Sequence, residues 1–296
     1  MAIDLSQLKS KGFMPQKQPG LASTRLKFVG GAATVEQLET IVEVARKYGR
    51  GVVHLTSRQG MEIPYVKAED AEEVERELEK GGVALGAAGA RVRSITACQG
   101  GCCCPSGIFD AQALAKDLDE RFGGRALPHK FKIGATACPN NCLKAEENDV
   151  GIKGAAVLTW KSDACVGCGL CAKACVRRRA ATVENRVLTI DEKLCVHCGK
   201  CAKACRKGAL LAKEGWALSF GGTFGNNVIK GRQILPILTD RDSVFRAIEA
   251  TLDFFATYAR PKERLVATIR RRGWKDFQKR IEAAVFSKEQ DANRKD

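Results

Sequence analysis

The sequence predicts an α+β protein in which a cysteine-rich segment interrupts the second half of the chain. Two patterns carry this prediction: strand-like and helix-like segments alternate over residues 24–95, and regularly spaced cysteines occupy residues 165–205. The chain has 296 residues, of which 45% are hydrophobic, and this suffices for one large domain or two to three small ones.

The first 95 residues predict strands and helices in the order β-α-β-β-α-β. A strand over residues 25–29 ends at a Gly-Gly pair, and Thr34 with Gln37 forms a capping box for a helix that ends before Gly49. Hydrophobic periodicity then predicts strands over residues 52–56 and 61–66, a charged helix over 68–80 and a last strand over 91–95. This order is the ferredoxin-like split βαβ topology, which by itself implies no iron–sulfur cluster.

The last third of the chain returns to this alternating pattern. Residues 216–220 read as a strand before Gly221 and Gly222, and two or three helices follow. The clearest helix runs from about Asp240 to Tyr258, with apolar residues recurring on one face.

Composition narrows the function to redox metal chemistry. Fourteen cysteines are many for an ordinary intracellular enzyme, and too dilute in 296 residues for a small disulfide-stapled domain. The net charge of +15 suits an anionic ligand or an acidic protein, while 6% aromatic residues and the lack of a nucleic-acid motif disfavour nucleic acid. No signal-peptide pattern or membrane-length apolar run is visible, so we expect a cytoplasmic protein without a membrane span.

Eight cysteines form two copies of the pattern C-x2-C-x2-C-x3-C, 30 residues apart, within residues 161–210, here called the cysteine module. The module resembles a bacterial two-cluster ferredoxin, in which the fourth cysteine of each run binds the other cluster. This crossing assigns one [4Fe-4S] cluster to Cys165, Cys168, Cys171 and Cys205, and the second to Cys195, Cys198, Cys201 and Cys175. Val176 and Arg206 stand where such ferredoxins carry proline. Zinc sites or disulfides are the alternative, but eight ligands in a duplicated run favour clusters.

The remaining cysteines lie in two motifs that resemble those of sirohaem-dependent sulfite and nitrite reductases. The motifs are Cys98–Pro105 and Cys138–Cys142, together with Lys27–Gly31, Thr56–Gly60, Lys130–Ile133 and Gly221–Gly225. The chain resembles in particular the small subunit of the anaerobic sulfite reductases.

The resemblance implies a third [4Fe-4S] cluster, coupled to sirohaem through one shared thiolate. Its ligands would be Cys98, Cys104, Cys138 and Cys142, with Cys142 also serving as the axial link to the sirohaem iron. Cys102 or Cys103 could replace Cys104; otherwise these two thiols are packing residues.

The same resemblance implies cations that bind the substrate anion and relay protons. The candidates are Arg58, Lys130, Lys132, Lys27 and Arg25. Lys27 stands where relatives usually carry arginine, and lysine cannot reproduce a bidentate grip. A solvated surface position is the alternative for any one of them.

The resulting organisation has three parts. Residues 1–95 form a ferredoxin-like split-βαβ domain, residues 96–160 with 211–296 form a sirohaem and [4Fe-4S] domain, and residues 161–210 form a two-cluster ferredoxin inserted into it. Full-length relatives contain two reductase halves and this chain has one, so we expect a homo-oligomer or a complex.

The expected function is reduction of sulfite to sulfide, with electrons relayed through the two ferredoxin-type clusters. No nicotinamide or flavin motif is present, so an electron-donor protein, either a ferredoxin or a flavin and iron–sulfur subunit, is the expected partner. The alternatives are a nitrite reductase of the same type and a non-catalytic polyferredoxin subunit. Because the motifs specify an anion site and not the anion, the sequence leaves sulfite and nitrite open.

Overall fold

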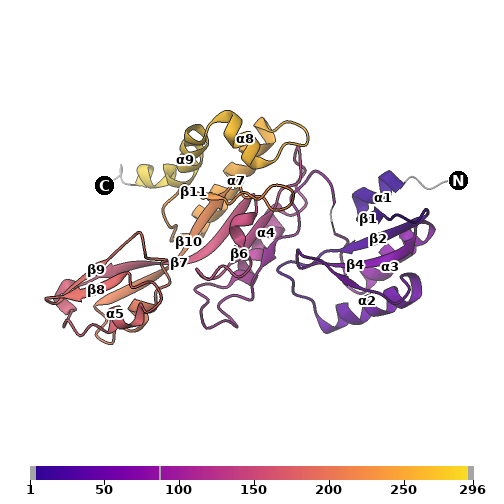
Figure 1. Cartoon of the computed structure of the whole chain (residues 1–296). Coiled ribbons are helices and arrows are strands. Elements are labelled where there is room, and N and C mark those ends of the chain that lie inside the picture. Colours follow the sequence, from indigo (N-terminus) through magenta and orange to yellow (C-terminus); the bar gives the residue numbers. More distant parts are fainter. Residues whose placement is uncertain (1–4, 87, 293–296) are drawn as a thin grey trace.

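The computed structural model describes residues 5–86 and 88–292. It has three parts in a row: an N-terminal sheet with its helices, a central sheet covered by the C-terminal helices, and the cysteine module at the far end (Figure 1). Among the described residues, no helix is both long and apolar enough to cross a membrane.

The N-terminal part is an antiparallel four-stranded sheet packed against two helices. Strand order is β1-β2-β4-β3, and the members are β1 (Phe13–Pro15), β2 (Leu21–Leu26), β3 (His54–Leu55), β4 (Met61–Lys67), α2 (Val35–Tyr48) and α3 (Ala71–Lys80), preceded by α1 (Leu5–Lys11). The predicted capping box is confirmed, because the Thr34 hydroxyl accepts from the Gln37 N–H and the Gln37 side chain accepts from the Thr34 N–H. A short 3₁₀ helix, η1 (Ala68–Asp70), opens the second helix.

The predicted last strand of this sheet, residues 91–95, is wrong. Leu85 instead forms a single antiparallel bridge with Leu26, while Val92 bridges Phe131 of the central part. Val92 and Ile95 are fully buried in the core of that part. The alternating pattern was therefore a correct sign of burial, but the burial is in the neighbouring core.

The central part is a five-stranded mixed sheet of order β11-β10-β7-β6-β5. Its strands are β5 (Thr96–Ala97), β6 (Ile133–Thr136), β7 (Val150–Trp160), β10 (Leu210–Phe220) and β11 (Arg232–Gln233). Strands β5, β6 and β7 are parallel, whereas β10 runs antiparallel to both β7 and β11.

Four helices complete the central core. They are α4 (Ala111–Phe122), α7 (Arg241–Tyr258), α8 (Leu265–Arg272) and α9 (Trp274–Ala292). The predicted helix is α7, and it begins at Asp240, whose carboxylate accepts from the Asp242 and Ser243 N–H groups. Aromatic contacts hold it: Phe255 packs against Phe131 before β6, with ring centroids 5.6 Å apart.

Strands β7 and β10 extend beyond this core and carry the cysteine module. They pair along eleven residues each, from Val150 opposite Phe220 to Trp160 opposite Leu210. The module contains η3 (Ser162–Ala164), α5 (Leu170–Ala174), α6 (Lys200–Lys203) and a two-stranded sheet of β8 (Ala181–Glu184) and β9 (Val187–Ile190). It has its own small core, distinct from that of the central sheet.

Candidate functional site

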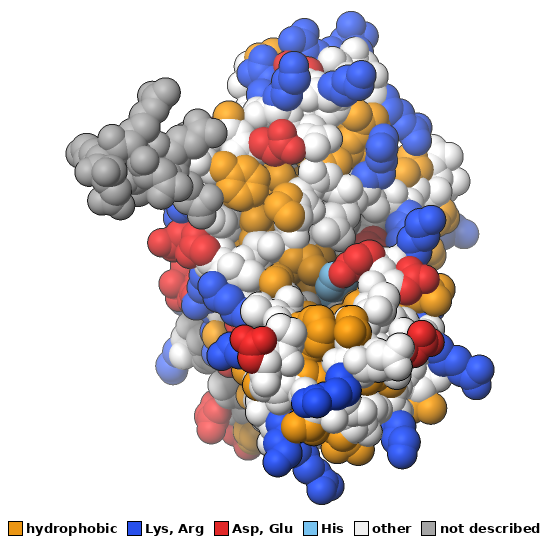
Figure 2. Space-filling model, turned by 90° about the vertical axis from the view of Figure 1, so that its left-hand side faces the viewer, with side chains coloured by type: hydrophobic (Ala, Val, Ile, Leu, Met, Phe, Trp, Pro, Cys, Tyr) orange, Lys and Arg blue, Asp and Glu red, His pale blue; other side chains and the backbone are white. Residues whose placement is uncertain are grey.

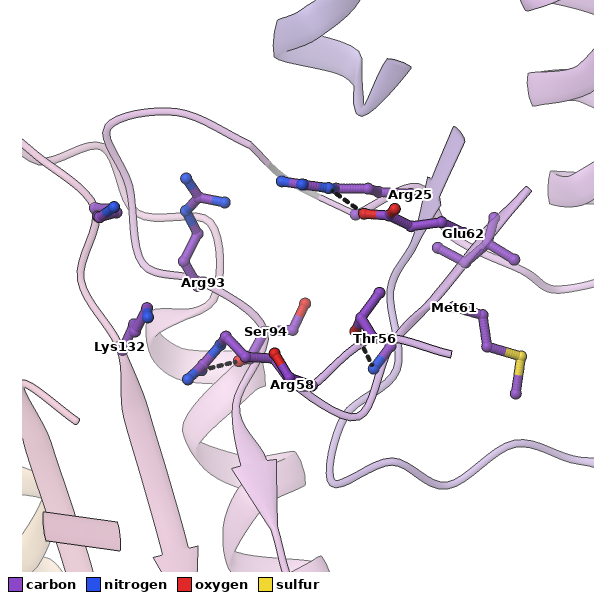
Figure 3. Close-up of a pocket in the computed structure, with 13 residues that line it drawn as sticks. Arg25, Thr56, Arg58, Met61, Glu62, Arg93, Ser94 and Lys132 are labelled. Atoms are coloured by element: carbon purple, nitrogen blue, oxygen red, sulfur yellow. Dashed lines mark hydrogen bonds and ion pairs between the residues drawn. The ribbon is translucent and has the colours of Figure 1, made fainter. Parts of the chain in front are cut away.

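A cationic cavity of about 300 Å³ lies between the N-terminal and central sheets. Arg25 on β2 and Arg58 in the β3–β4 turn come from the first sheet, whereas Arg93, Lys130 and Lys132 come from segments leading into β5 and β6. Figure 3 shows Arg25 at the top and Arg58 at the bottom of the view, with Arg93 and Lys132 along its left side. Four of the five predicted cations therefore line one cavity.

Arg58 is held in one orientation by the central part. Its Nη1 donates to Asn148 Oδ1 at 2.8 Å and its Nη2 donates to the Ser94 carbonyl at 3.2 Å. Burial lowers the pKa of Arg58 to about 10, which leaves it protonated at neutral pH. The next residue fastens the turn, because the Gln59 amide exchanges two hydrogen bonds with the backbone of Ala97, at 2.8 and 2.9 Å.

Lys132 lies beside a buried carboxylate. Asp149 is fully buried; its Oδ2 accepts from the Lys132 backbone N–H at 2.8 Å and from Arg264 Nη2 at 2.7 Å. The pKa of the Lys132 ammonium is lowered to about 8, first by burial and then by the positive charges of Arg58 and Arg264, and Asp149 opposes the shift. Lys132 is thus a cation that can give up a proton near neutral pH.

Arg25 and Lys27 have partners that limit their availability. Arg25 Nε donates to Glu62 Oε1 at 2.6 Å at the edge of the cavity. Lys27 does not line the cavity; its Nζ pairs with Asp119 Oδ2 of α4 at 2.5 Å. In this structure Lys27 joins the N-terminal part to helix α4 of the central part and does not line the anion cavity.

Four residues of this region were not predicted from the sequence: Arg93, Asn148, Asp149 and Arg264. Arg93 carried a weak signal, since it alternates with buried Val92 in a strand-like segment. Asn148 and Asp149 precede a strand, where such residues are common in turns, so nothing in the sequence marked them.

The four cysteines predicted for the coupled cluster come together at one end of the central sheet. Burial raises the pKa of Cys138, and the thiols of Cys104, Cys142 and Cys98 raise it further. Cys98 Sγ accepts from the Ala137 N–H at 3.1 Å, a bond that suits a thiolate. Thiols that lie close enough to repel one another as thiolates fit a metal cluster, because coordination supplies the missing positive charge.

Cys102 and Cys103 differ from Cys104 in their exposure. Both are exposed, and their sulfur atoms are 3.7 Å from each other. Cys104 is half-buried, and its thiol helps to raise the pKa of Cys138. The geometry therefore favours Cys104 as the ligand.

The cysteine module contains two small cavities, each lined by four cysteines. Cys165, Cys168, Cys171 and Cys205 line one, and Cys175, Cys195, Cys198 and Cys201 line the other. These are the two crossed sets that the ferredoxin resemblance implies. Among the described residues, no three His, Cys, Asp or Glu side chains are placed to hold a single metal ion. In a [4Fe-4S] cluster each thiolate binds a different iron, so the four sulfur atoms of a set need not meet at one ion.

A third cavity, of about 120 Å³, lies between the module and the coupled-cluster cysteines. Its lining includes Cys138 and Pro139 on one side and Cys198 and Lys200 on the other. The second cysteine set of the module is therefore the inner one, nearest to the central sheet.

Comparison with known families identifies residues 88–288 as a nitrite and sulphite reductase 4Fe-4S domain. Residues 14–81 match the nitrite/sulfite reductase ferredoxin-like half domain. The chain therefore belongs to the nitrite and sulphite reductase family, as the sequence motifs predicted.

Two curated relatives are sulfite reductases. The chain is 33% identical over 250 residues to the coenzyme F420-dependent sulfite reductase of Methanocaldococcus jannaschii, covering 84% of this chain and 40% of that protein. It is 30% identical over 197 residues to one subunit of the anaerobic sulfite reductase of Salmonella typhimurium, covering 59% of this chain and 56% of that subunit. The chain thus matches less than two thirds of the length of either relative.

Solved structures share the fold. Dissimilatory sulfite reductase I matches with a TM-score of 0.68 at 21% identity, over 88% of this chain and 69% of that one. The NirA protein of Mycobacterium tuberculosis matches with a TM-score of 0.66 at 16% identity, over 95% and 46%. At these identities the likeness concerns the fold alone.

Proposed function

We propose that this chain is a sirohaem-dependent sulfite reductase that reduces sulfite to sulfide with electrons relayed through the cysteine module. The observation that carries the proposal is the cavity in which Arg58, Arg93, Lys130 and Lys132 converge from two parts of the fold. So many cations around one hollow suit an oxyanion substrate and the carboxylate groups of sirohaem.

The residues present fit the two coupled cofactors. Cys98, Cys104, Cys138 and Cys142 would hold a [4Fe-4S] cluster, and Cys142 would link that cluster to the sirohaem. Cys142 is exposed whereas Cys138 is buried, which suits a thiolate that reaches out to a second group. When bound, sirohaem would supply an open iron site at which sulfur–oxygen bonds break.

The cations of the chain would bind the substrate and supply protons. Arg58 presents a planar guanidinium fixed from behind by Asn148 and Ser94, which suits two sulfite oxygens. Each oxygen that leaves as water takes up two protons. Lys132, with its lowered pKa, is the side chain best suited to deliver them.

The two cysteine sets of the module would carry electrons in sequence. The cavity shared by Cys198 and Cys138 supports an order in which the set containing Cys198 passes electrons to the coupled cluster. The set containing Cys165 would receive them first. A second copy of the chain, or another subunit, would supply the missing reductase half.

Nitrite reduction is the second candidate, because several relatives carry that name. One is the nitrite reductase [NAD(P)H] of Bacillus subtilis, 32% identical over 139 residues. The cationic cavity favours either reductase over the non-catalytic polyferredoxin alternative, because a subunit that only carries electrons needs no anion site.

The test is an optical spectrum followed by steady-state kinetics. Anaerobically reconstituted protein should show the red absorption band of sirohaem beside the cluster absorption, and should reduce sulfite faster than nitrite at equal concentration. Iron and sulfide without the chromophore would remove the enzyme proposal. Faster turnover of nitrite would retain the proposed cofactors and would make nitrite, instead of sulfite, the substrate.

A further inference from the structure

We propose that the face of the cysteine module around Cys168 is the docking surface for an acidic electron-transfer protein. The inference rests on the proposed function and adds the place of electron entry and the chemistry of the donor. The surface, here called the entry face, comprises Val166, Cys168, Arg186, Val187 and Lys207.

The strand pair fixes which cluster site is outermost. The inner set, which contains Cys198, packs near the middle of the β7–β10 strand pair. There the Ala156 N–H donates to the His197 carbonyl at 2.7 Å. The outer set lies at the tips, because its cavity is lined by Trp160 and Leu210, the last paired residues. The four residue-to-residue steps from 156 to 160 span about 13 Å along an extended strand. The outer site is therefore the farther one from the coupled cluster.

The outer site also reaches the surface. Cys168 is an exposed cysteine, and Val166 beside it is 49% exposed. Val187, at the start of β9, is 51% exposed. Apolar side chains beside a redox site, left open to solvent, suit a transient protein interface.

Basic side chains border these apolar residues. Arg186 lies against the cysteine loop: its Nη2 donates to the Cys165 carbonyl at 3.3 Å, and a Cβ on Gly167 would meet its Cγ at 2.7 Å. Lys207 lines the same cavity from the other side. Figure 2 looks onto this end of the molecule, where apolar side chains in the lower half are bordered by Lys and Arg.

The charge of the module selects an acidic partner. Residues 161–210 hold eleven Lys and Arg against four Asp and Glu, which is a net charge of +7 in about a sixth of the chain. Two oxidised [4Fe-4S] clusters with their thiolates would add about four negative charges and leave the module basic. An acidic donor is therefore steered toward this end and held by the basic border, while a basic one is repelled.

Charge reversal on the entry face tests the proposal in the reconstituted full chain. Activity is measured with two donors: an acidic two-cluster bacterial ferredoxin and methyl viologen radical, a small cation that needs no docking surface. Arg186→Glu with Lys207→Glu should raise the KM for ferredoxin about tenfold at low salt and leave the methyl viologen rate unchanged. Lys279→Glu on α9 is the control, an exposed lysine outside the module, and should behave like the unmodified chain.

A second measurement tests the proposal even if the double variant Arg186→Glu with Lys207→Glu loses its clusters. In the unmodified chain, the ferredoxin KM should rise steeply with salt, because screening weakens a basic docking face. A KM insensitive to salt, or a double variant with full cluster content and the normal ferredoxin KM, would overturn the entry face. If the chain shows no sulfite or nitrite reduction with methyl viologen, the proposed function fails. Salt-dependent binding of ferredoxin by calorimetry then still decides the docking surface.

Discussion

At the scale of single residues, the buried carboxylate of Asp149 organises cations beside the anion cavity. Asp149 accepts from Arg264 and from the backbone of Lys132, and its neighbour Asn148 accepts from Arg58. Two adjacent side chains thus position two guanidinium groups, those of Arg58 and Arg264, and the backbone of Lys132. The arrangement fixes charge before substrate arrives, so little reorganisation is needed during reaction.

Lys132 should set the alkaline limit of activity. Below its pKa of about 8 the side chain is a cation with a proton to give, and above it both properties are lost. The rate of sulfite reduction should therefore fall as pH rises through about 8. Lys132→Arg should remove this limb while lowering kcat about 100-fold, because arginine keeps its charge but does not release a proton. Lys213→Arg, on an exposed part of β10, is the control, and an unchanged pH profile in Lys132→Arg would refute the role.

Loss of the Asn148 side chain should weaken substrate binding. Asn148→Ala leaves Arg58 Nη1 without its acceptor, and a hydrogen bond to a charged group contributes about 1.5–3 kcal/mol. We expect the KM for sulfite to rise about tenfold or more, and the thermal midpoint to fall as well, because buried Asn148 also donates to the Ala145 carbonyl. An unchanged KM and an unchanged kcat would show that the Ser94 carbonyl alone holds the guanidinium.

The three consecutive thiols should differ in their effect on iron content. Cys104→Ser should remove the coupled cluster, about a third of the iron, whereas Cys102→Ser and Cys103→Ser should retain it. Iron and sulfide analysis after identical reconstitution makes the comparison. Iron loss in Cys102→Ser with retention in Cys104→Ser would reverse the ligand assignment.

At the scale of elements, the ends of helices and strands place the chemistry. The Arg58 turn is closed by Gln59, which pairs with β5, and by Thr56, whose hydroxyl accepts from the Gly60 N–H at 3.1 Å. The late glycine pair fits the same purpose, since a Cβ on Gly222 would overlap the Glu146 carbonyl oxygen. Glycine is needed there because the loop packs directly on the segment that carries Asn148 and Asp149.

The N-cap of α7 should contribute measurably to stability. Asp240→Ala removes the acceptor of two N–H groups and should lower the free energy of unfolding by about 1 kcal/mol. Asp242→Ala, in the exposed first turn without a capping role, should cost less. Urea unfolding followed by circular dichroism provides the measurement, and equal losses would show that charge near the helix end, and not the cap, is responsible.

At the scale of the whole molecule, the sequence predicted local elements well and their pairing less well. The capping box at Thr34 and the helix from Asp240 depend on neighbouring residues, so their signals are complete in the sequence. Residues 91–95 carry the alternation of a buried strand, and nothing local states which of two adjacent cores takes them. Their contact with Phe131 decides it.

The residues of the candidate site also fall into two groups: those marked by local sequence motifs and those brought together only by the fold. Arg58, Lys130 and Lys132 lie in motifs and converge as expected, while Lys27 pairs with Asp119 because α4 happens to pass beside it. Asn148, Asp149 and Arg264 make their contacts with residues that are distant in the sequence, so these contacts exist only in the folded chain. Arg264 is 115 positions away in the chain from its partner Asp149.

The long strand pair has a consequence for how such a protein can be assembled from parts. The cysteine module leaves the sheet at Trp160 and returns at Leu210, directly across the ladder, so its two ends are neighbours. A segment whose ends already meet can be exchanged for another, or for a tight turn, without stretching or re-registering the sheet that receives it. Strands β7 and β10 therefore act as a fixed attachment point for an inserted segment. The segment attached there determines how electrons reach the reductase fold.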